Sequence, residues 1–272
     1  MIHYATWSQG NDSALMPTLT APSDPGYFAF KGAFGGWTLA HAMTAAIGPQ
    51  AKFTDDAAIP LTATIDFLRG IGEGPVISAP QVTSETKSAR FFRITTSHAD
   101  NVCASTSFIV SRRRPTDHVA AQAMPECALP ESLPAAQFPP TPNTWLGQFE
   151  MRIAEGKPLK PNPHMRSLFW TKFRDGAPLD FFRLAALADA SLPRIFFHYP
   201  ELSPISTVTM TVHFHASAAD LNAIASDFVL IESSSQIARS GFYDQCVRLW
   251  SRSGNLLATS TQMAWFNVST AQ

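Results

Sequence analysis

The sequence predicts an α+β protein made of two similar halves, in which each half has a buried helix followed by long antiparallel strands. Three observations predict it: a proline-rich stretch divides the chain, a strand pattern recurs 147 residues further on, and each half begins with an apolar helical segment. With 272 residues, of which 45% are hydrophobic, the chain can fill two sizeable cores.

The stretch that divides the chain is rich in proline. Proline restricts φ and lacks a backbone N–H, so a dense run of prolines forms neither a helix interior nor a central strand. We therefore expect an N-terminal unit over residues 1–114, a linker over 115–146 and a C-terminal unit over 147–272. The prolines concerned are Pro115, Pro125, Pro130, Pro134, Pro139, Pro140 and Pro142.

The recurring strand pattern is an alternation of apolar and polar residues, which is typical of a strand with one buried face. It is found in both halves in the same phase. The residues expected to face inward are Leu61, Ala63, Ile65 and Phe67 in the first half and Val208, Met210, Val212 and Phe214 in the second.

Two further landmarks extend the repeat towards the end of each half. Ser88-Ala89-Arg90 is matched to Ile237-Ala238-Arg239, and the segment 101–105 is matched to 255–259. The second half then has a longer hairpin between its landmarks. An internal duplication explains these matches.

Each half also has an apolar helical segment ahead of its strands. Residues 37–47, after Phe34-Gly35-Gly36, are apolar nearly all round, as in a helix surrounded by protein. In the second half Pro178 suits a first helical turn, and the following residues up to Ala188 are mostly apolar. A long helix wrapped by an antiparallel sheet is the hot-dog plan, so we expect a double hot-dog of two tandem units.

Composition excludes several classes of function. The net charge of −1 lacks the surplus of cations that nucleic-acid binding requires, and the three cysteines form no CxxC pair that would suit zinc. No secretory signal is apparent at the N-terminus, and the uncharged stretch 32–51 contains glycines and a proline that disfavour a membrane span. These observations favour a cytoplasmic protein.

Several motifs resemble the acyl-CoA thioesterase II family of double hot-dog enzymes, over most of the chain outside the linker. Phe34-Gly35-Gly36 is similar to that family's Phe-Gly-Gly helix start, and Phe67-Leu68-Arg69-Gly70 resembles its Phe-Leu-Arg-Pro-Gly strand end. Ala89-Arg90 and Ser107-Phe108 fall where the family has an Arg-bearing strand and a Ser-Phe strand end. The resemblance implies hydrolysis of acyl-CoA to a free acid and coenzyme A.

The resemblance also implies a catalytic trio of Asp, Thr and Gln. The family's Asp follows the second apolar helix, where this chain has Asp189, and its Thr opens the strand that ends in Phe-His, here Thr207. Its Gln lies in the last strand, in a context matched by Ala258-Thr259-Ser260-Thr261-Gln262. The family's Gln-Glu-Gly reads Gln262-Met263-Ala264 here, and its His-Arg-Pro reads His215-Ala216-Ser217, which leaves the substrate preference open.

The repeat supports a single site in the second half. Alone, Asp189 could merely cap a turn, and Thr207 could simply favour a strand. In the first half, however, the positions matched to Asp189, Thr207 and Gln262 are occupied by Ala42, Pro60 and Phe108. All three polar groups are lost together, as expected of a redundant copy.

The expected mechanism is direct attack of water on the thioester carbonyl. Asp189 would orient or deprotonate the water, Thr207 and Gln262 would hydrogen-bond it, and the N–H of Gly36 at a helix start is our candidate donor to the oxyanion. No cofactor and no metal ion is expected. We also expect a homo-oligomer, because a double hot-dog chain still exposes curved sheet surface that symmetric association would bury.

Other constellations are less informative. A hot-dog enoyl-CoA hydratase pairs its Asp with a nearby His, which the residues after Asp189 lack, and a non-catalytic acyl-binding protein is the remaining alternative. His213 and His215 share a strand face without a third ligand, and Arg112-Arg113-Arg114 could meet coenzyme A phosphates or be merely solvated. The sequence contains no GxSxG motif, which argues against a serine hydrolase of the α/β type.

Overall fold

The computed structural model describes residues 7–8, 16–138, 141–162 and 164–267. Most strands of the described chain belong to one large antiparallel sheet. In the first half these are β1 (Trp7–Ser8), β2 (Thr18–Pro22), β5 (Ala58–Phe67), β6 (Pro75–Glu85), β7 (Ala89–His98) and β8 (Asn101–Arg112). In the second they are β9 (Phe149–Glu155), β10 (Ser167–Phe173), β11 (Ile205–Phe214), β12 (Val229–Ser234), β13 (Ala238–Arg239), β14 (Phe242–Trp250) and β15 (Leu256–Phe266).

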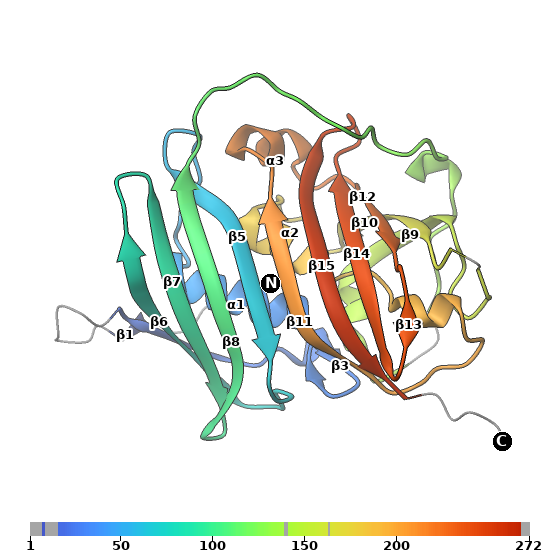
Figure 1. Cartoon of the computed structure of the whole chain (residues 1–272), viewed down its shortest axis with the longest axis horizontal. Coiled ribbons are helices and arrows are strands. Elements are labelled where there is room, and N and C mark those ends of the chain that lie inside the picture. Colours follow the sequence, from blue (N-terminus) through green and yellow to red (C-terminus); the bar gives the residue numbers. More distant parts are fainter. Residues whose placement is uncertain (1–6, 9–15, 139–140, 163, 268–272) are drawn as a thin grey trace.

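The two halves meet edge to edge in this sheet. The strand order is β1-β2-β6-β7-β8-β5-β11-β15-β14-β12-β10-β9, so β5 and β11 join the halves as antiparallel neighbours (Figure 1). A separate ribbon pairs β3 (Phe28–Ala29) with β4 (Gly32–Ala33). Each half thereby covers an edge strand of the other, which would otherwise be free to pair with strands of other molecules.

Corresponding strands of the two halves carry a β-bulge at the same place. In the first half the register between β5 and β8 shifts between Pro60 and Thr62. In the second, the register between β11 and β15 shifts between Thr207 and Thr209. The bulges lie 147 positions apart, which is the spacing that the sequence pattern indicated.

The bulge corrects one detail of that pattern. Leu61 and Val208 were expected to face inward, but they are the extra residues of the two bulges, and they are 36% and 42% exposed. An extra residue changes which side chains face the core on either side of it. The next two inward positions are as expected, because Ala63 and Met210 are fully buried.

One of the landmark matches is wrong. Arg90 pairs with Val110, and Tyr243 pairs with Ala264, so Ala89-Arg90 on β7 corresponds to Phe242-Tyr243 on β14. Ala238–Arg239 instead form β13, a short strand that precedes β14. The similar Ala-Arg pairs therefore lie on strands that are not equivalent, because β13 is the hairpin partner of the strand that matches β7. Strand pairing, and not local sequence, decides the match.

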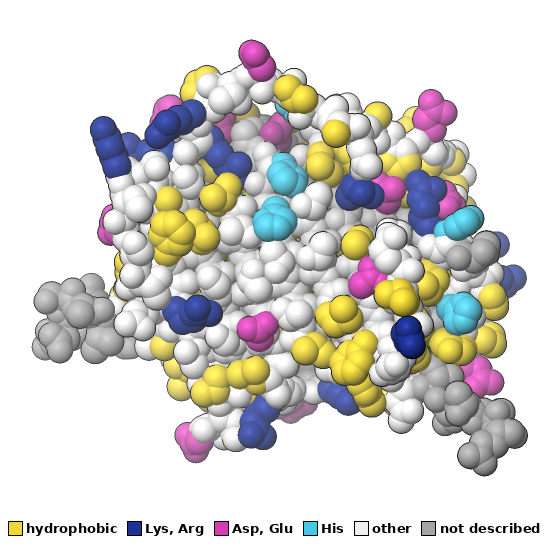
Figure 2. All heavy atoms as spheres, in the orientation of Figure 1, with side chains coloured by type: hydrophobic (Ala, Val, Ile, Leu, Met, Phe, Trp, Pro, Cys, Tyr) yellow, Lys and Arg dark blue, Asp and Glu magenta, His cyan; other side chains and the backbone are white. Residues whose placement is uncertain are grey.

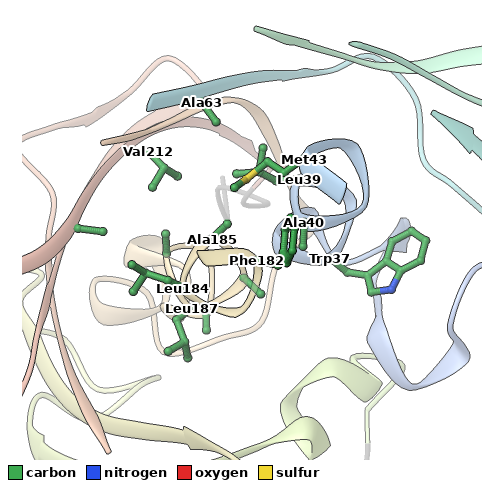
Figure 3. Close-up of a cluster of buried hydrophobic side chains, with 14 of the residues drawn as sticks. Trp37, Leu39, Ala40, Met43, Ala63, Phe182, Leu184, Ala185, Leu187 and Val212 are labelled. Carbon is green, nitrogen blue, oxygen red and sulfur yellow. The ribbon is translucent and has the colours of Figure 1, made fainter. Parts of the chain in front are cut away.

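Two helices cover one face of the sheet and lie against each other (Figures 1 and 3). Every residue of α1 (Gly35–Ile47) from Gly36 to Ala46 is buried, which confirms the helix surrounded by protein. Figure 3 shows Ala40 and Phe182 in the space between the helices, with Ala63 and Val212 extending from the sheet towards them. The small Ala40 lets the helices approach closely.

The second helix is much shorter than expected. A long helix was predicted in each half, yet α2 (Phe181–Leu187) has seven residues. It begins after Asp180, whose side chain accepts a hydrogen bond from the Arg183 N–H, and the chain leaves the helix at Ala188. The next residue along the chain is Asp189, whose tertiary contacts are described below.

The predicted linker has little regular structure but packs on the protein. Its described part contains the 3-10 turn η2 (Pro130–Ser132) and the start of η3 (Thr144–Gln148). Trp145 stacks on Phe34 with ring centroids 4.7 Å apart. The short helix α3 (Ala218–Ile224) and the turns η1 (Pro25–Tyr27) and η4 (Arg194–Phe197) complete the fold.

The outer face of the sheet is turned away from the helices. Figure 2 shows that its middle, over β5 and β11, is largely uncharged, with histidine side chains near its centre. Among the described residues, no helix is both long enough and apolar enough to cross a membrane.

Candidate active site

A cavity of about 670 Å³ lies between the two halves. Its walls come from both: Phe34 and Phe67 from the first half, Asp189 and Gln262 from the second, and Trp145 from the intervening segment. More than half of the lining residues are apolar and about a third are polar, a mixture that suits a small-molecule site.

The two glycines of the Phe34-Gly35-Gly36 motif let Asp189 and the backbone of α2 lie close to the start of α1. A Cβ atom on Gly35 would lie 2.8 Å from Asp189 Oδ2, and one on Gly36 would lie 2.7 Å from the Ala186 carbonyl oxygen. A larger residue at either position would therefore displace a neighbour. The two glycines admit the carboxylate and the backbone of α2 to the start of α1.

Asp189 turns back from the end of α2 towards that helix start. Its Oδ2 accepts a hydrogen bond of 2.8 Å from the Gly36 N–H, and its Oδ1 accepts one of 2.9 Å from Gln262 Nε2. The positive end of the α1 dipole also favours a carboxylate at this place. The first half thus supplies the peptide donor, and the second half supplies the acid and the amide.

The environment of Asp189 raises the pKa of its carboxyl group. Asp189 keeps some accessible surface because it lines the cavity, but the surrounding protein desolvates the carboxylate. This desolvation raises the pKa of Asp189 to about 7, against the opposing effect of the hydrogen bonds from Gln262 and Gly36. A carboxyl group with this pKa can exchange a proton near neutral pH.

The other two expected residues lie on the same wall of the cavity. Gln262 on β15 pairs with Met210 on β11 and is 7% exposed, and its Nε2 also lies 3.4 Å from Met210 Sδ. Thr207 lines the cavity next to the β11 bulge. In this structure its hydroxyl is not hydrogen-bonded to Asp189 or Gln262.

The N–H of Gly36 does not face an empty space. The sequence suggested it as an oxyanion donor, but the structure brings this N–H to Asp189 Oδ2. A peptide N–H is a single donor, so in this arrangement it serves the carboxylate.

Sequence reasoning missed two polar residues of the cavity wall. Tyr243 and Gln245 are two residues apart on β14, so their side chains point to the same face of the sheet, and both line the cavity. Burial raises the pKa of Tyr243 well above its ordinary value. Their period-two spacing was a usable signal once β14 had been placed beside β15.

Arg194 was also missed, and it holds the segment that follows Asp189. It is fully buried and donates from Nε and Nη2 to the Leu192 carbonyl oxygen, at 3.1 and 2.6 Å, and from Nη1 to Ser167 Oγ at 2.9 Å. Burial lowers the pKa of Arg194 to about 9. Bonds from one guanidinium to the loop and to β10 order the chain just beyond the carboxylate.

The other sequence candidates lie outside this cavity. His213 Nδ1 is 3.0 Å from Thr62 Oγ1, and His215 Nε2 is 3.1 Å from Thr259 Oγ1. Within the described chain, no group of His, Cys, Asp or Glu is arranged to hold a metal ion. Arg113 donates to the Pro60 and Phe214 carbonyl oxygens at 3.1 and 2.5 Å, so it ties the two halves together.

Comparison with models of protein families finds a match for each half of the chain. Residues 24–111 match the acyl-CoA thioesterase N-terminal domain, and residues 130–266 match the acyl-CoA thioesterase C-terminal domain. The chain belongs to the acyl-CoA thioesterase family. A search of curated protein sequences finds no significant match.

Solved structures agree with a hot-dog-type fold. A hot-dog protein of unknown function from Alicyclobacillus acidocaldarius has 25% identity and a TM-score of 0.86, over 93% of this chain and 94% of that one. A putative thioesterase II from Thermobifida fusca has 17% identity and a TM-score of 0.78, over 92% of each chain. An acyl-CoA thioesterase II from Mycobacterium marinum has 16% identity and a TM-score of 0.73, over 97% of each.

Proposed function

We propose that the protein hydrolyses acyl-CoA thioesters to a free carboxylic acid and coenzyme A by direct attack of water. The observation that carries the proposal is the desolvated Asp189 carboxylate, which faces the cavity while Gly36 and Gln262 hold its two oxygens. Each carboxylate oxygen keeps a further lone pair for a water molecule.

The chemical step needs only the substrate, water and one base. Asp189 takes a proton as the water oxygen attacks the thioester carbonyl carbon, and the C–S bond then breaks as the sulfur leaves with that proton. A base with a pKa of about 7 suits this task, because it is substantially ionised at neutral pH and still accepts a proton readily.

Gln262, Thr207 and Gly36 have supporting roles in this proposal. Gln262 orients the carboxylate through its Nε2, and Thr207 faces the same space and contacts the water or substrate. We assign the Gly36 N–H to positioning Asp189. A carboxylate held from two sides requires little reorganisation during the reaction.

We further propose that the fold is a double hot-dog whose units are residues 1–114 and 147–272, joined by 115–146. The equivalent bulges in β5 and β11 support this division, as does the meeting of the halves through these two strands. The site then needs both units, because Gly36 comes from one and Asp189 from the other.

The alternatives receive less support. A hydratase of this fold would pair its Asp with a histidine, and the described residues that line the cavity include none. A non-catalytic acyl-binding protein has no need of a carboxylate held by two donors in a desolvated place, which costs stability.

The deciding experiment measures thiol release from a panel of acyl-CoA thioesters by the parent and by Asp189→Asn. We expect the parent to hydrolyse at least one thioester, and the substitution to lower kcat by about 100-fold or more, because an amide cannot accept the proton. Melting curves on the same samples check that the variant is folded. Near-parental turnover by a folded variant would remove Asp189 from the mechanism.

A further inference from the structure

The cavity wall beside Asp189 contains a second glutamine that the mechanism above does not use. Gln245 on β14 lies directly opposite Gln262 on β15 in the antiparallel ladder. Directly opposed residues have Cβ atoms about 4.5–5.5 Å apart on the same face of the sheet. The two carboxamides are therefore neighbours, and one of them is bonded to the proposed base.

Gln245 has a buried acceptor without a protein partner. Its side chain is 3% exposed, and among the described residues no donor reaches its Oε1. A buried carbonyl oxygen that lacks a hydrogen bond destabilises a folded protein. Gln245 also lines the cavity, which can therefore hold a donor to this oxygen.

The equivalent place in the first half is filled quite differently. There Phe92 on β7 lies opposite Phe108 on β8, and the rings stack with centroids 5.8 Å apart. The pairing partners show the equivalence, because Phe108 lies opposite Ala63 and Gln262 lies opposite Met210. An apolar pair that fills a core in one half is thus replaced by two amides beside a cavity in the other.

We propose that Gln245 is a further catalytic residue, whose Oε1 accepts the second hydrogen of the attacking water. Attack requires a water lone pair to point at the carbonyl carbon, so both hydrogens of the water must be directed elsewhere. One is donated to Asp189, and the other needs an acceptor on the same wall. Gln245 Oε1 is buried and unpartnered, and its residue lies directly opposite Gln262, which donates to Asp189.

This inference rests on the proposed hydrolysis and adds a distinct expectation about stability. Gln245→Leu removes the acceptor and keeps a similar side-chain size. We expect kcat to fall by about 10- to 100-fold with little change in KM, because the water loses its orientation. The melting temperature should stay equal or rise, because an unpartnered buried oxygen is gone. A purely structural role predicts the opposite change in melting temperature.

Two further variants sharpen the test. Gln245→Glu retains an acceptor oxygen at the same place and should keep more of the parental kcat than Gln245→Leu. Phe92→Leu is the matched control, since it alters the equivalent position of the first half, which does not line the cavity. It should keep kcat and lower the melting temperature.

The assay uses a straight-chain acyl-CoA and its 3-hydroxyacyl analogue of equal length. Loss of kcat on both substrates supports the water-holding role. A loss confined to the hydroxylated substrate would overturn it and assign Gln245 to recognition of the acyl chain. Parental kcat in Gln245→Leu, or a lowered melting temperature, would also overturn it. If the parent itself released no thiol from any acyl-CoA, the proposed function would fail instead.

Discussion

At the scale of single residues, we expect the carboxyl group of Asp189 to make the proposed activity depend on pH near neutrality. Desolvation raises its pKa to about 7, and only the ionised form can accept a proton from water. We therefore expect kcat/KM to rise with pH up to about 7 and then to level off. A pH–rate profile measures this directly, and an acid limb near the ordinary pKa of an aspartate, about 4, would contradict the desolvated environment.

The same shift predicts how stability depends on pH. Between about pH 4 and 7 the folded protein keeps a proton on Asp189 that the unfolded chain has lost, so rising pH weakens the fold through this group. Asp189→Asn carries no such charge. We expect it to exceed the parent by about 1–3 kcal/mol in free energy of unfolding at about pH 8, and urea titrations should show this advantage vanishing near about pH 4.

Gly35 is predicted to be as sensitive as the polar residues. A methyl group there would lie 2.8 Å from both Asp189 Oδ2 and Phe67 Cζ, so Gly35→Ala must displace the carboxylate or the ring. We expect kcat to fall at least about 10-fold, since small displacements of a catalytic group are costly. Gly147→Ala is the control, because nothing lies within 4 Å of the added atom, and it should keep parental kinetics.

At the scale of elements, β8 and β15 occupy equivalent places but carry different residues there, Phe108 on β8 and Gln262 on β15. Gln262→Phe copies Phe108 of the first half, so β15 should still pair with β11 and β14, whereas hydrolysis should be lost in kcat. The ring removes the donor to Asp189 and fills the space next to it. Steady-state kinetics with circular dichroism test both parts, and parental hydrolysis by this variant would move the site out of the second half.

The reverse exchange tests the same equivalence from the other side. Phe108 is fully buried against Phe92, so Phe108→Gln should lower the free energy of unfolding by about 2–4 kcal/mol, through lost packing and an unpaired amide. It should add no second activity, because Ala42 and Pro60 provide neither a carboxylate nor a hydroxyl. Chemical denaturation measures the cost, and an unchanged midpoint would argue against the shared core position.

At the scale of the whole molecule, the outer sheet face predicts self-association. The exposed Val208 lies at the β11 bulge next to Thr209, whose partner on β15 is the exposed Met263. Phe242, 44% exposed, begins the adjoining strand β14. Symmetric pairing of copies would bury this apolar area. We expect light scattering at micromolar concentration to give a multiple of 29.6 kDa, and the mass of one chain would contradict it.

Much of the plan could be predicted from local pattern. The buried helix up to Ile47 and the repeated strands followed from hydrophobic periodicity, which reports which side of an element is buried. Periodicity failed at Leu61 and Val208, because a bulge changes the phase without changing the residue types. It placed the end of the second helix just before Asp189, as observed, but not the start, because α2 begins at Phe181 rather than near Pro178.

The sequence by itself determined the repeated plan, the family and the residue types of the candidate site, because motifs and alternation depend on near neighbours along the chain. Only the tertiary structure decided what those residues do together. Gly36 and Asp189 are 153 residues apart, and their hydrogen bond exists because the helices of the two halves pack against each other. Gln245 became visible only through its pairing with Gln262, because strand register and burial are properties of the assembled sheet and not of any one segment.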